Sequence, residues 1–274
     1  ARQQVALVQV LGVARAHVAD PALVRKAAEG REHETRPCIA CNQGCAGFLA
    51  QSLAITCLSN PATGREATWP PEPDRAAHPR NVLVIGGGPA GMEAAAVAAK
   101  RGHRVTLWEA SDALGGALRW NAHMTKRRDF MLLIEAQIAA LARAGVEVRL
   151  NTRATGEAIM AAGADAVVLA TGATQTATPL TRGTALTMEA ALGMGSALGN
   201  HVVVEDRTGS WAVAGLIEHL ADTGRRVSVL APAGAPGWQV NIYSGFAWRQ
   251  RLREAKVRIL PLHAAQSLDG RRLE

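Results

Sequence analysis

Aromatic residues are scarce in this chain of 274 residues, where they make up 4% of the composition. Lysine is also rare, because arginine supplies most of the positive charge behind the net charge of +7 at pH 7. A nucleic-acid-binding face is typically a basic stripe with interleaved aromatic side chains. The arginines are scattered instead, so we expect no nucleic-acid partner and interpret them as part of a solvated surface. A basic face that docks an acidic electron-transfer partner is the alternative.

Long apolar runs are also missing. No uncharged apolar stretch approaches the roughly 18–20 residues that a membrane helix needs, and the start shows no secretory signal pattern. We therefore expect a cytoplasmic protein with no membrane partner. Hydrophobic residues make up 48% of the chain, which is enough to bury a core. Residue 1 is alanine, which indicates a processed, trimmed or partial chain.

Cysteine is confined to one window of the sequence. Disulfide scaffolds normally spread their cysteines along a short secreted chain. Four thiolates suit either Zn²⁺ or an iron–sulfur cluster, and three crowded ligands with a distant fourth suit a [4Fe–4S] cluster better than the paired knuckles of zinc. The sequence therefore predicts a [4Fe–4S] cluster, with zinc or two disulfides as alternatives. The predicted ligands follow the spacing Cys38-x2-Cys41-x3-Cys45-x11-Cys57.

Strands alternate with helices over most of the chain, which predicts an α/β fold with parallel sheets. An apolar run at 5–13 predicts a strand, and Asp20-Pro21 and Gly30 bracket a helix over 20–29. The segment 31–77 is irregular, with the cysteines first and a proline-rich linker after them. Two nucleotide-fold units follow. Their predicted strands lie at 81–85, 104–108, 146–150 and 165–169 in the first and at 201–205 and 227–230 in the second, with helices at 90–101, 129–144 and 211–222.

The first unit carries a dinucleotide-binding turn. Gly86-x-Gly88-x-x-Gly91, with Pro89 and Ala90 inside it, follows a strand and opens a helix, as this fingerprint requires. The first glycine permits the tight turn, the second lets the backbone approach a pyrophosphate, and the third lets the helix pack closely on the strand. The positive end of the helix dipole then faces the phosphates. A glycine turn that serves packing alone is the alternative.

Later segments of the same unit strengthen this prediction. Glu109 ends the second strand and can accept hydrogen bonds from ribose hydroxyls, which disfavours the 2′-phosphate of NADP. Glycines further on allow the backbone to run close to a bound dinucleotide. The additional candidate residues are Gly115, Gly116 and the run Ala170-Thr171-Gly172.

These motifs together resemble a known family. The stretches LGVARAHVADPALVRKA, RPCIACNQGC and NVLVIGGGPAGMEAAAVAAKRGHRVTLWEASDALGG resemble the iron–sulfur flavoproteins of the trimethylamine dehydrogenase, histamine dehydrogenase and 2,4-dienoyl-CoA reductase family. The similarity covers residues 10–173, through GADAVVLATGA, and becomes looser afterwards.

The resemblance implies a (β/α)8 barrel that binds FMN and substrate, then the cluster, then an FAD- or ADP-binding domain with an inserted nucleotide fold. Gly12 and Arg15 would lie where the final barrel loop meets the FMN phosphate, with Arg15 as a surface residue as the alternative. The rest of the barrel would belong to another domain or subunit, and we expect an oligomer. The barrel end, the cluster loop with its linker, the FAD/ADP-binding domain and the incomplete inserted fold would occupy 1–35, 36–77, 78–199 and 200–274.

The second unit distinguishes the branches of the family. A reductase that takes hydride from NAD(P)H needs a second glycine fingerprint after the strand 201–205. Only Gly209 is present there. The carboxylates of Glu205 and Asp206 would repel a pyrophosphate at close range, and Trp211 adds bulk near the turn. We interpret this unit as a nucleotide fold without a nicotinamide site. That resembles the amine-dehydrogenase branch, where electrons leave singly to a partner such as electron-transferring flavoprotein.

We therefore predict the electron-transfer portion of an iron–sulfur flavoprotein oxidoreductase of the amine or N-methyl dehydrogenase type, with an external electron acceptor. An NAD(P)H-dependent enoate or 2,4-dienoyl-CoA-type reductase and a non-catalytic docking subunit with structural ADP are the alternatives. No general base or nucleophile is identifiable, so we predict no catalytic residue in this chain. Isolated histidines are expected on the surface or in packing contacts, namely His33, His78, His123, His201, His219 and His263.

Overall fold

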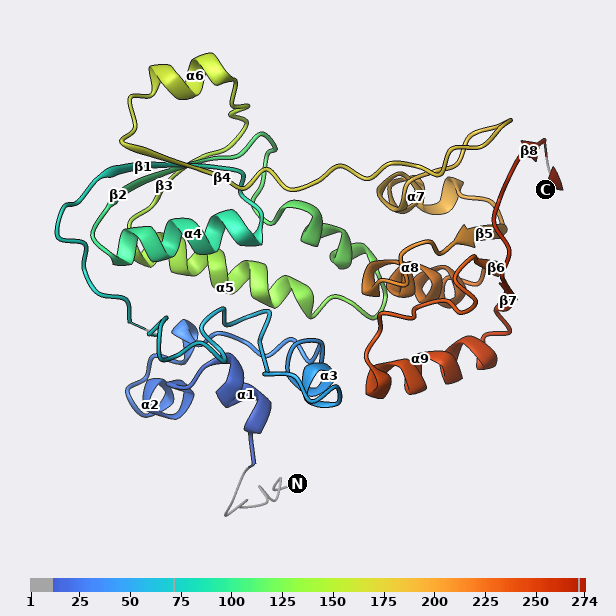
Figure 1. Ribbon diagram of the computed structural model, residues 1–274, viewed down its shortest axis with the longest axis horizontal. Coiled ribbons are helices and arrows are strands. Elements are labelled where there is room, and N and C mark those ends of the chain that lie inside the picture. Colours follow the sequence, from blue (N-terminus) through green and yellow to red (C-terminus); the bar gives the residue numbers. More distant parts are fainter. Residues whose placement is uncertain (1–11, 71, 271) are drawn as a thin grey trace, which may run out of the picture.

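The structure is a computed structural model that describes residues 12–70, 72–270 and 272–274. It consists of an N-terminal segment and two α/β lobes (Figure 1). The first lobe lies on the left of that view, the second on the right, and the N-terminal segment lies below them. Within the described residues, no helix has the length and apolar character needed to cross a membrane.

The N-terminal segment is built from short helices. The predicted strand at 5–13 lies almost wholly outside the described residues, and residues 12 and 13 are not in a strand. The structure has a helix, α1, where the sequence predicted only a connection. The next helix begins at Leu23, after Ala22, and the carboxylate of Asp20 accepts the N–H of Ala22 and pairs with Lys26. The elements are α1 (Ala14–Ala19), α2 (Leu23–Ala28), the 3-10 helix η1 (Glu32–Glu34) and α3 (Ala46–Leu49).

Four parallel strands form the sheet of the first lobe, in the order β3-β2-β1-β4. Helices α4 (Pro89–Lys100) and α5 (Phe130–Arg143) cover one face, and α6 (Gly156–Ala161) lies on the other. Because the strands run in one direction, the turns that follow them meet at one edge of the sheet. The strands are β1 (Asn81–Ile85), β2 (Arg104–Trp108), β3 (Glu147–Arg149) and β4 (Ala166–Leu169).

Three parallel strands form the sheet of the second lobe, in the order β5-β6-β7, so the predicted parallel α/β fold is confirmed. The central strand β6 is buried at every residue but its first, as expected for a sheet covered on both faces. The strands are β5 (His201–Glu205), β6 (Arg226–Ala231) and β7 (Arg258–Pro261), with helices α7 (Met188–Met194), α8 (Trp211–Asp222) and α9 (Ile242–Glu254). Shorter elements are the 3-10 helices η2 (Gly116–His123) and η3 (Gly195–Ala197) and the antiparallel pair β8 (Leu268–Asp269) and β9 (Arg272–Leu273).

The two lobes share buried side chains where they meet. Met124, which follows η2 of the first lobe, belongs to the apolar core of the second lobe together with Ile217 and Trp248. Beside it, the buried Arg127 forms an ion pair with the buried Glu218 of α8, with 3.3 Å between Nη2 and Oε2. The core of the second lobe is therefore completed by a loop of the first.

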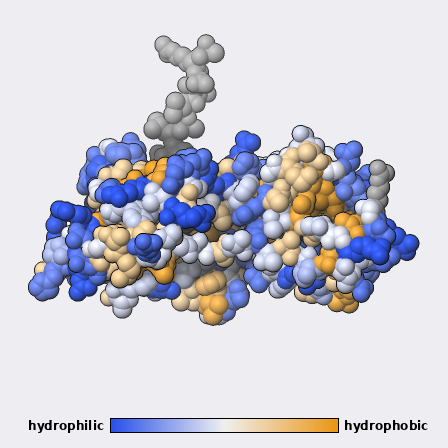
Figure 2. Space-filling view, turned by 90° about the horizontal axis from the view of Figure 1, so that it is seen from above, coloured by the Kyte–Doolittle hydropathy of each residue, from blue (hydrophilic) through white to orange (hydrophobic). Residues whose placement is uncertain are grey.

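On the face seen in Figure 2, apolar groups form separate patches on both lobes instead of one continuous belt.

Candidate functional site

The turn after β1 brings the predicted dinucleotide glycines together. Gly86 has a φ of +105°, and a Cβ there would overlap the carbonyl oxygen of Ala170. A Cβ at Gly91 would overlap the carbonyl oxygen of Gly86 itself. Both positions therefore need glycine, because β1, α4 and the loop after β4 approach one another at backbone distance.

Open space lies beside Gly88, which is the N-cap of α4. A Cβ at Gly88 would meet no atom within 4 Å, and Pro89 and Ala90 follow it in the first turn of the helix. Gly116, with a φ of +52°, lies on the other side of the turn, where its Cβ would be 3.0 Å from the Gly88 Cα. The positive end of the α4 dipole faces this space, which suits a phosphate group.

The loops after β2 and β4 are hydrogen-bonded to the same turn. The N–H of Gly115 donates to the carbonyl of Gly87 over 2.8 Å. The N–H of Ala170 donates over 2.8 Å to the carbonyl of Ile85, the last residue of β1. Gly172 follows Thr171 with a φ of +70° and has no atom within 4 Å of its Cβ position. These residues thus lie together at the carboxyl edge of the sheet, and their contact with a ligand stays a prediction.

The carboxylate of Glu109 is bound to the glycine turn. Its Oε2 accepts the N–H of Gly87 over 2.6 Å, and its Oε1 accepts the N–H and the hydroxyl of Ser111 over 2.7 and 2.8 Å. Burial by itself would raise the pKa of Glu109, but these donors outweigh burial and hold the pKa below its usual range. The predicted contact of Glu109 with a ribose hydroxyl stays a prediction.

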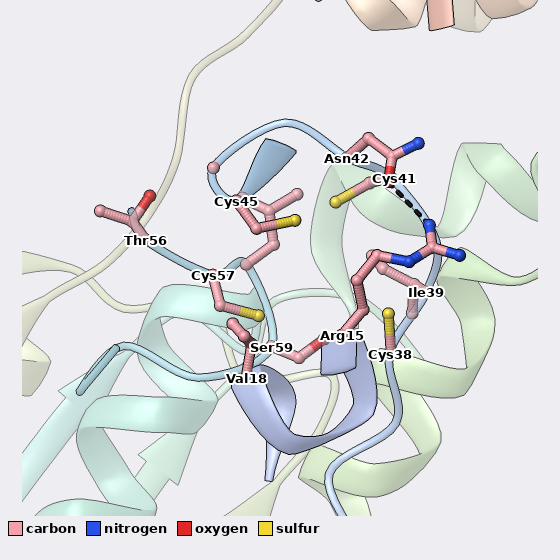
Figure 3. A pocket seen from close by; sticks show the side chains of 12 residues that line it. Arg15, Val18, Cys38, Ile39, Cys41, Asn42, Cys45, Thr56, Cys57 and Ser59 are labelled. Atoms are coloured by element: carbon pink, nitrogen blue, oxygen red, sulfur yellow. Dashed lines mark hydrogen bonds between the residues drawn. The ribbon is translucent and has the colours of Figure 1, made fainter. Parts of the chain in front are cut away.

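The four cysteines line one pocket, and Figure 3 shows their sulfur atoms directed toward the same space. The pocket encloses about 330 Å³ of empty space, part of it open to solvent. The loop that carries the first three cysteines folds back on the fourth, since the N–H of Thr56 donates to the carbonyl of Gly44 over 2.8 Å. All four thiols are free and half-buried, namely Cys38, Cys41, Cys45 and Cys57.

Burial raises the pKa of the Cys41 and Cys57 thiols. The main-chain N–H of Gln43 opposes this shift at Cys41, and those of Ser59 and Asn60 oppose it at Cys57. Such donors stabilise negative charge on sulfur, which a thiolate ligand needs. Among the described residues, no group of three or more His, Cys, Asp or Glu side chains could hold a single metal ion. The sulfurs surround the pocket and do not converge on one point.

Arg15 lines the same pocket as the cysteines. Its Nη1 donates to Oδ1 of Asn42 over 2.7 Å, as the dashed line in Figure 3 shows. Gly12 is exposed near the start of the described chain and has no atom within 4 Å of its Cβ position. The predicted contact of both residues with an FMN phosphate stays a prediction.

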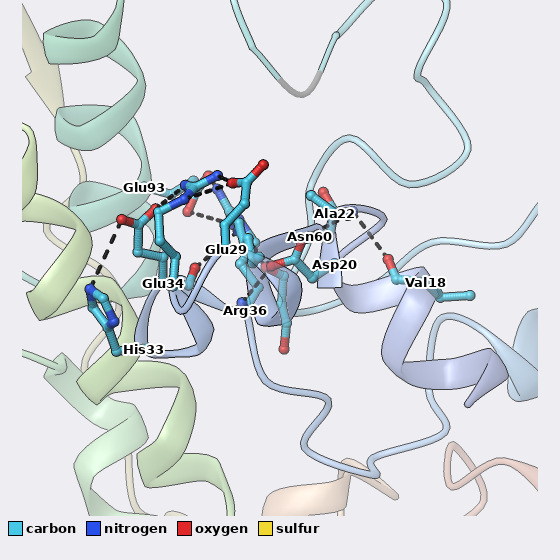
Figure 4. A network of polar contacts seen from close by, with 12 residues as sticks. Val18, Asp20, Ala22, Glu29, His33, Glu34, Arg36, Asn60 and Glu93 are labelled. Carbon is cyan, nitrogen blue, oxygen red and sulfur yellow. Dashed lines mark hydrogen bonds and ion pairs between the residues drawn. The ribbon is translucent and has the colours of Figure 1, made fainter. Parts of the chain in front are cut away.

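An ion pair that no sequence motif indicated joins the cysteine segment to the first lobe. Arg36 donates from Nη2 and Nη1 to the two carboxylate oxygens of Glu93 on α4, over 2.7 and 3.1 Å. The same guanidinium donates to the carbonyl of Ser59 over 2.9 Å, and the Arg36 N–H donates to Asp20 (Figure 4). Arg36 lies two residues before the first cysteine and Ser59 two residues after the last. One side chain thus fixes both ends of the cysteine segment to the helix that begins at the glycine turn.

A buried carboxylate occupies the turn after β5. Asp206 is fully buried, and its Oδ1 accepts the N–H of Gly209 over 2.7 Å and that of Thr208 over 3.2 Å. Its Oδ2 accepts the N–H of Gly237 over 2.8 Å. A dinucleotide fold uses N–H groups at this place, before the first helix of the unit, to bind phosphate. Asp206 takes these donors for the chain itself, and its predicted repulsion of a pyrophosphate stays a prediction.

A tryptophan covers the same turn. A Cβ on Gly209 would overlap the ring of Trp238, and the N–H of Gln239 donates to the Gly209 carbonyl over 3.0 Å. The sequence predicted bulk near this turn from Trp211, and the centroid of that ring lies 4.8 Å from the guanidinium carbon of Arg127 in a cation–π contact. Trp238 lies nearly thirty residues beyond Gly209 in the sequence, so no local motif indicated it.

The sequence of this chain is similar to those of known oxidoreductases. The family model described as pyridine nucleotide-disulphide oxidoreductase matches residues 71–192, which contain the glycine turn. A probable N-methylproline demethylase of Rhizobium meliloti (strain 1021) is 38% identical over 82% of this chain and 33% of its own length. These relatives are oxidoreductases, and the family resemblance that the motifs indicated is confirmed.

Two solved structures of the family have the same fold. The 6-hydroxypseudooxynicotine amine oxidase of Pseudomonas geniculata N1 is 28% identical with a TM-score of 0.86, over 96% of this chain and 42% of that chain. A 2-naphthoyl-CoA reductase is 30% identical with a TM-score of 0.84, over 94% of this chain and 39% of that chain. The chain therefore spans less than half the length of the family members that it matches.

Proposed function

We propose that this chain is the electron-transfer portion of an iron–sulfur flavoprotein oxidoreductase of the amine or N-methyl dehydrogenase type. The observation that carries the proposal is the single pocket lined by all four cysteines of the chain. Amine oxidase and demethylase relatives support the substrate class. The substrate site and FMN would belong to a barrel in another part of the protein or in a partner subunit.

The donor set of the pocket fits a [4Fe–4S] cluster. Four soft thiols are available as ligands, and backbone N–H groups stabilise negative charge at Cys41 and Cys57. A zinc ion needs its four sulfurs at about 2.3 Å from one point, and the described side chains provide no such group. A bound cluster would supply one-electron redox chemistry, with Cys38 and Cys45 as the remaining ligands.

The residues around the pocket would hold this cofactor close to the nucleotide domain. The guanidinium of Arg36 ties the cysteine segment to Glu93 on α4. Arg15 lines the pocket beside the thiols and donates a hydrogen bond to Asn42. The glycine turn and Glu109 would bind the ADP part of FAD, or ADP itself, at the N-terminus of α4. Helix α4 would thus orient both the cluster and the FAD or ADP.

The turn after β5 in the second lobe supports an external electron acceptor, such as an electron-transferring flavoprotein. Asp206 accepts the N–H groups of this turn and Trp238 covers it, so these two residues would oppose the pyrophosphate of a nicotinamide dinucleotide there. A nucleotide diphosphate would have to displace a buried carboxylate from three N–H donors, which is costly. Electrons would therefore leave to a partner protein and not as hydride to NAD⁺.

Metal analysis of the full-length protein, purified without air, tests the cluster. We expect iron and acid-labile sulfide near the stoichiometry of one [4Fe–4S] cluster per chain. Cys57→Ser should lose most of both, whereas the neighbouring Thr56→Ser, which keeps its hydroxyl, should retain them. One zinc per chain and no iron would contradict the proposal, and a cluster that no reductant or substrate reduces would favour a docking subunit.

The second candidate is an NAD(P)H-dependent reductase, favoured by the similarity to 2-naphthoyl-CoA reductase. Mixing the full-length protein with NADH or NADPH in a stopped-flow instrument separates the two candidates. Rapid flavin bleaching by either nucleotide would favour the reductase. Flavin reduction by amines alone would favour the dehydrogenase.

A further inference from the structure

The cysteine pocket has a charged side chain in its wall. Arg15, on α1, lines this pocket together with the four cysteines. Apart from the thiols themselves, the other described residues of the lining are uncharged, and none of them is an aspartate or a glutamate. The guanidinium is always protonated, so it is a permanent positive charge that no carboxylate of this wall neutralises.

A hydrogen bond holds the guanidinium beside the thiols. Its Nη1 donates to Oδ1 of Asn42 over 2.7 Å, on the side of the pocket where Cys38 and Cys41 lie (Figure 3). Asn42 follows Cys41 directly and has a φ of +56°, a left-handed conformation that asparagine adopts more readily than most residues. Its carbonyl accepts the N–H of Gly47 over 2.8 Å, which fixes the acceptor in turn. The charge of Arg15 is therefore held at a defined place in the loop of the ligands.

Fastening the loop does not by itself account for an arginine at this position. The hydrogen bond between Arg15 and Asn42 is exposed to solvent, and such bonds contribute little to stability because water competes for both partners. The bond uses Nη1 alone, so the remaining donors stay compatible with the predicted contact to an FMN phosphate. What distinguishes Arg15 from the other residues of the wall is its charge beside the ligands.

A charge at this place acts on the redox chemistry that the pocket would support. An electron that enters an iron–sulfur cluster adds negative charge, which a nearby cation stabilises. The thiols are half-buried, so this interaction is screened less than it would be in bulk water. The net charge around a cluster is one of the factors that set its reduction potential. A cation fixed beside the ligands therefore favours the reduced state.

We propose that Arg15 raises the reduction potential of the cluster that the four cysteines would hold. The inference rests on the proposed function, because it concerns the same pocket. In each transfer a single electron enters the cluster from the reduced flavin and leaves to the external acceptor. Arg15 itself gains and loses no atom or electron, and its charge makes the cluster easier to reduce.

A redox titration of the full-length protein, purified without air and followed by electron paramagnetic resonance, tests this role. Arg15→Gln should lower the midpoint potential, with a shift of about threefold or more in the equilibrium constant of reduction, which is about 28 mV for one electron. Arg15→Lys keeps a positive charge and should stay close to the parent. Arg25→Gln is the matched control, since it removes the same charge from an exposed position on α2 outside the pocket.

The outcomes separate this role from the proposed function. A parent protein without iron and acid-labile sulfide would overturn both. A cluster with the same potential in the parent and in Arg15→Gln would overturn only the role of Arg15, and so would an equal fall in Arg25→Gln. Loss of FMN from Arg15→Gln would remove a phosphate anion and raise the potential, so a fall in the potential cannot result from it.

A pair of variants on either side of Cys41 covers the case in which Arg15→Gln holds no cluster. Asn42→Gly keeps the left-handed backbone but removes the acceptor that holds the guanidinium. Ala40→Gly replaces the other neighbour of Cys41, which also has a positive φ (+51°), and leaves the contact of Arg15 intact. We expect a lower midpoint potential in Asn42→Gly than in Ala40→Gly, because the released charge moves into solvent and is screened there. Equal potentials in the two variants would overturn the proposal.

Discussion

The guanidinium of Arg36 and the carboxylate of Glu93 meet side by side, with two N–H donors facing two oxygens at 2.7 and 3.1 Å. The two residues are 57 positions apart, and their contact fastens the cysteine segment to α4. Such paired, charge-assisted hydrogen bonds are stronger and more directional than single ones. The position of the cysteine pocket relative to the glycine turn therefore depends on this contact.

Arg36→Met should lower the free energy of unfolding by about 2 kcal/mol, because it leaves the half-buried Glu93 unpaired. Denaturant unfolding of the full-length protein measures this change. Arg149→Met is a suitable control, since its ion pair with Glu147 is exposed and should contribute less than about 1 kcal/mol. Equal losses in both variants would show that the Arg36 anchor has no special role.

Two alanine substitutions in the glycine turn should have opposite consequences. Gly91→Ala should destabilise the protein by about 3 kcal/mol or more, because its methyl group would overlap the carbonyl oxygen of Gly86. Gly88→Ala should leave stability nearly unchanged, because its methyl group meets no protein atom, yet weaken dinucleotide binding. Thermal unfolding and the flavin content of the purified protein measure the two effects. Full flavin content in Gly88→Ala would contradict the predicted pyrophosphate position.

Glu109 should make stability depend on pH in the acid range. Its pKa is lower in the folded protein than in the unfolded chain, since the donors of Ser111 and Gly87 outweigh burial. The carboxylate therefore stabilises the fold above the pKa of a free glutamate, about 4.3, and this contribution is lost as the pH falls toward the lower folded value. Unfolding midpoints measured from pH 7 down to about pH 2.5 should fall less steeply below about pH 4.3 in Glu109→Gln. Parallel curves would contradict this account.

Asp206→Ala should cost about 3 kcal/mol or more of unfolding free energy, since it leaves three N–H groups, two of them buried, without this acceptor. Asp269→Ala removes an exposed partner of Arg182 and should change stability by less than about 1 kcal/mol. Chemical denaturation compares the two. A mild effect at Asp206 would mean that water replaces the carboxylate, and the turn would then be accessible to a phosphate.

Substituting the two residues of the buried ion pair at the lobe junction should lower the free energy of unfolding by different amounts. Glu218 faces both Arg127 and Arg251, so Glu218→Met leaves two arginines without their counter-ion and should cost about 3–5 kcal/mol. Arg127→Met should cost less, because Arg251 still pairs with Glu218. The double variant Arg127→Met/Glu218→Met should recover part of the loss. A double-mutant cycle in denaturant measures this, and additive effects would exclude a coupling between the two side chains.

Local patterns in the chain were sufficient to predict most elements of both lobes. The β-branched runs NVLVI and HVVVE form β1 and β5, because such side chains favour extended backbone. The glycines of the turn were recognisable for a similar reason, since a tight turn and a close helix–strand approach exclude any Cβ. The short α1 escaped prediction because six residues carry little periodic signal.

The partners of polar side chains were decided by tertiary packing. Nothing near Asp206 in the sequence indicates that the N–H of Gly237 completes its coordination, and nothing near Gly209 indicates the ring of Trp238. The same holds for Arg36 with Glu93, because a side chain's partner depends on how whole elements pack and not on local spacing. Backbone propensities act within a few residues, whereas these contacts join segments that only the folded chain brings to hydrogen-bond distance.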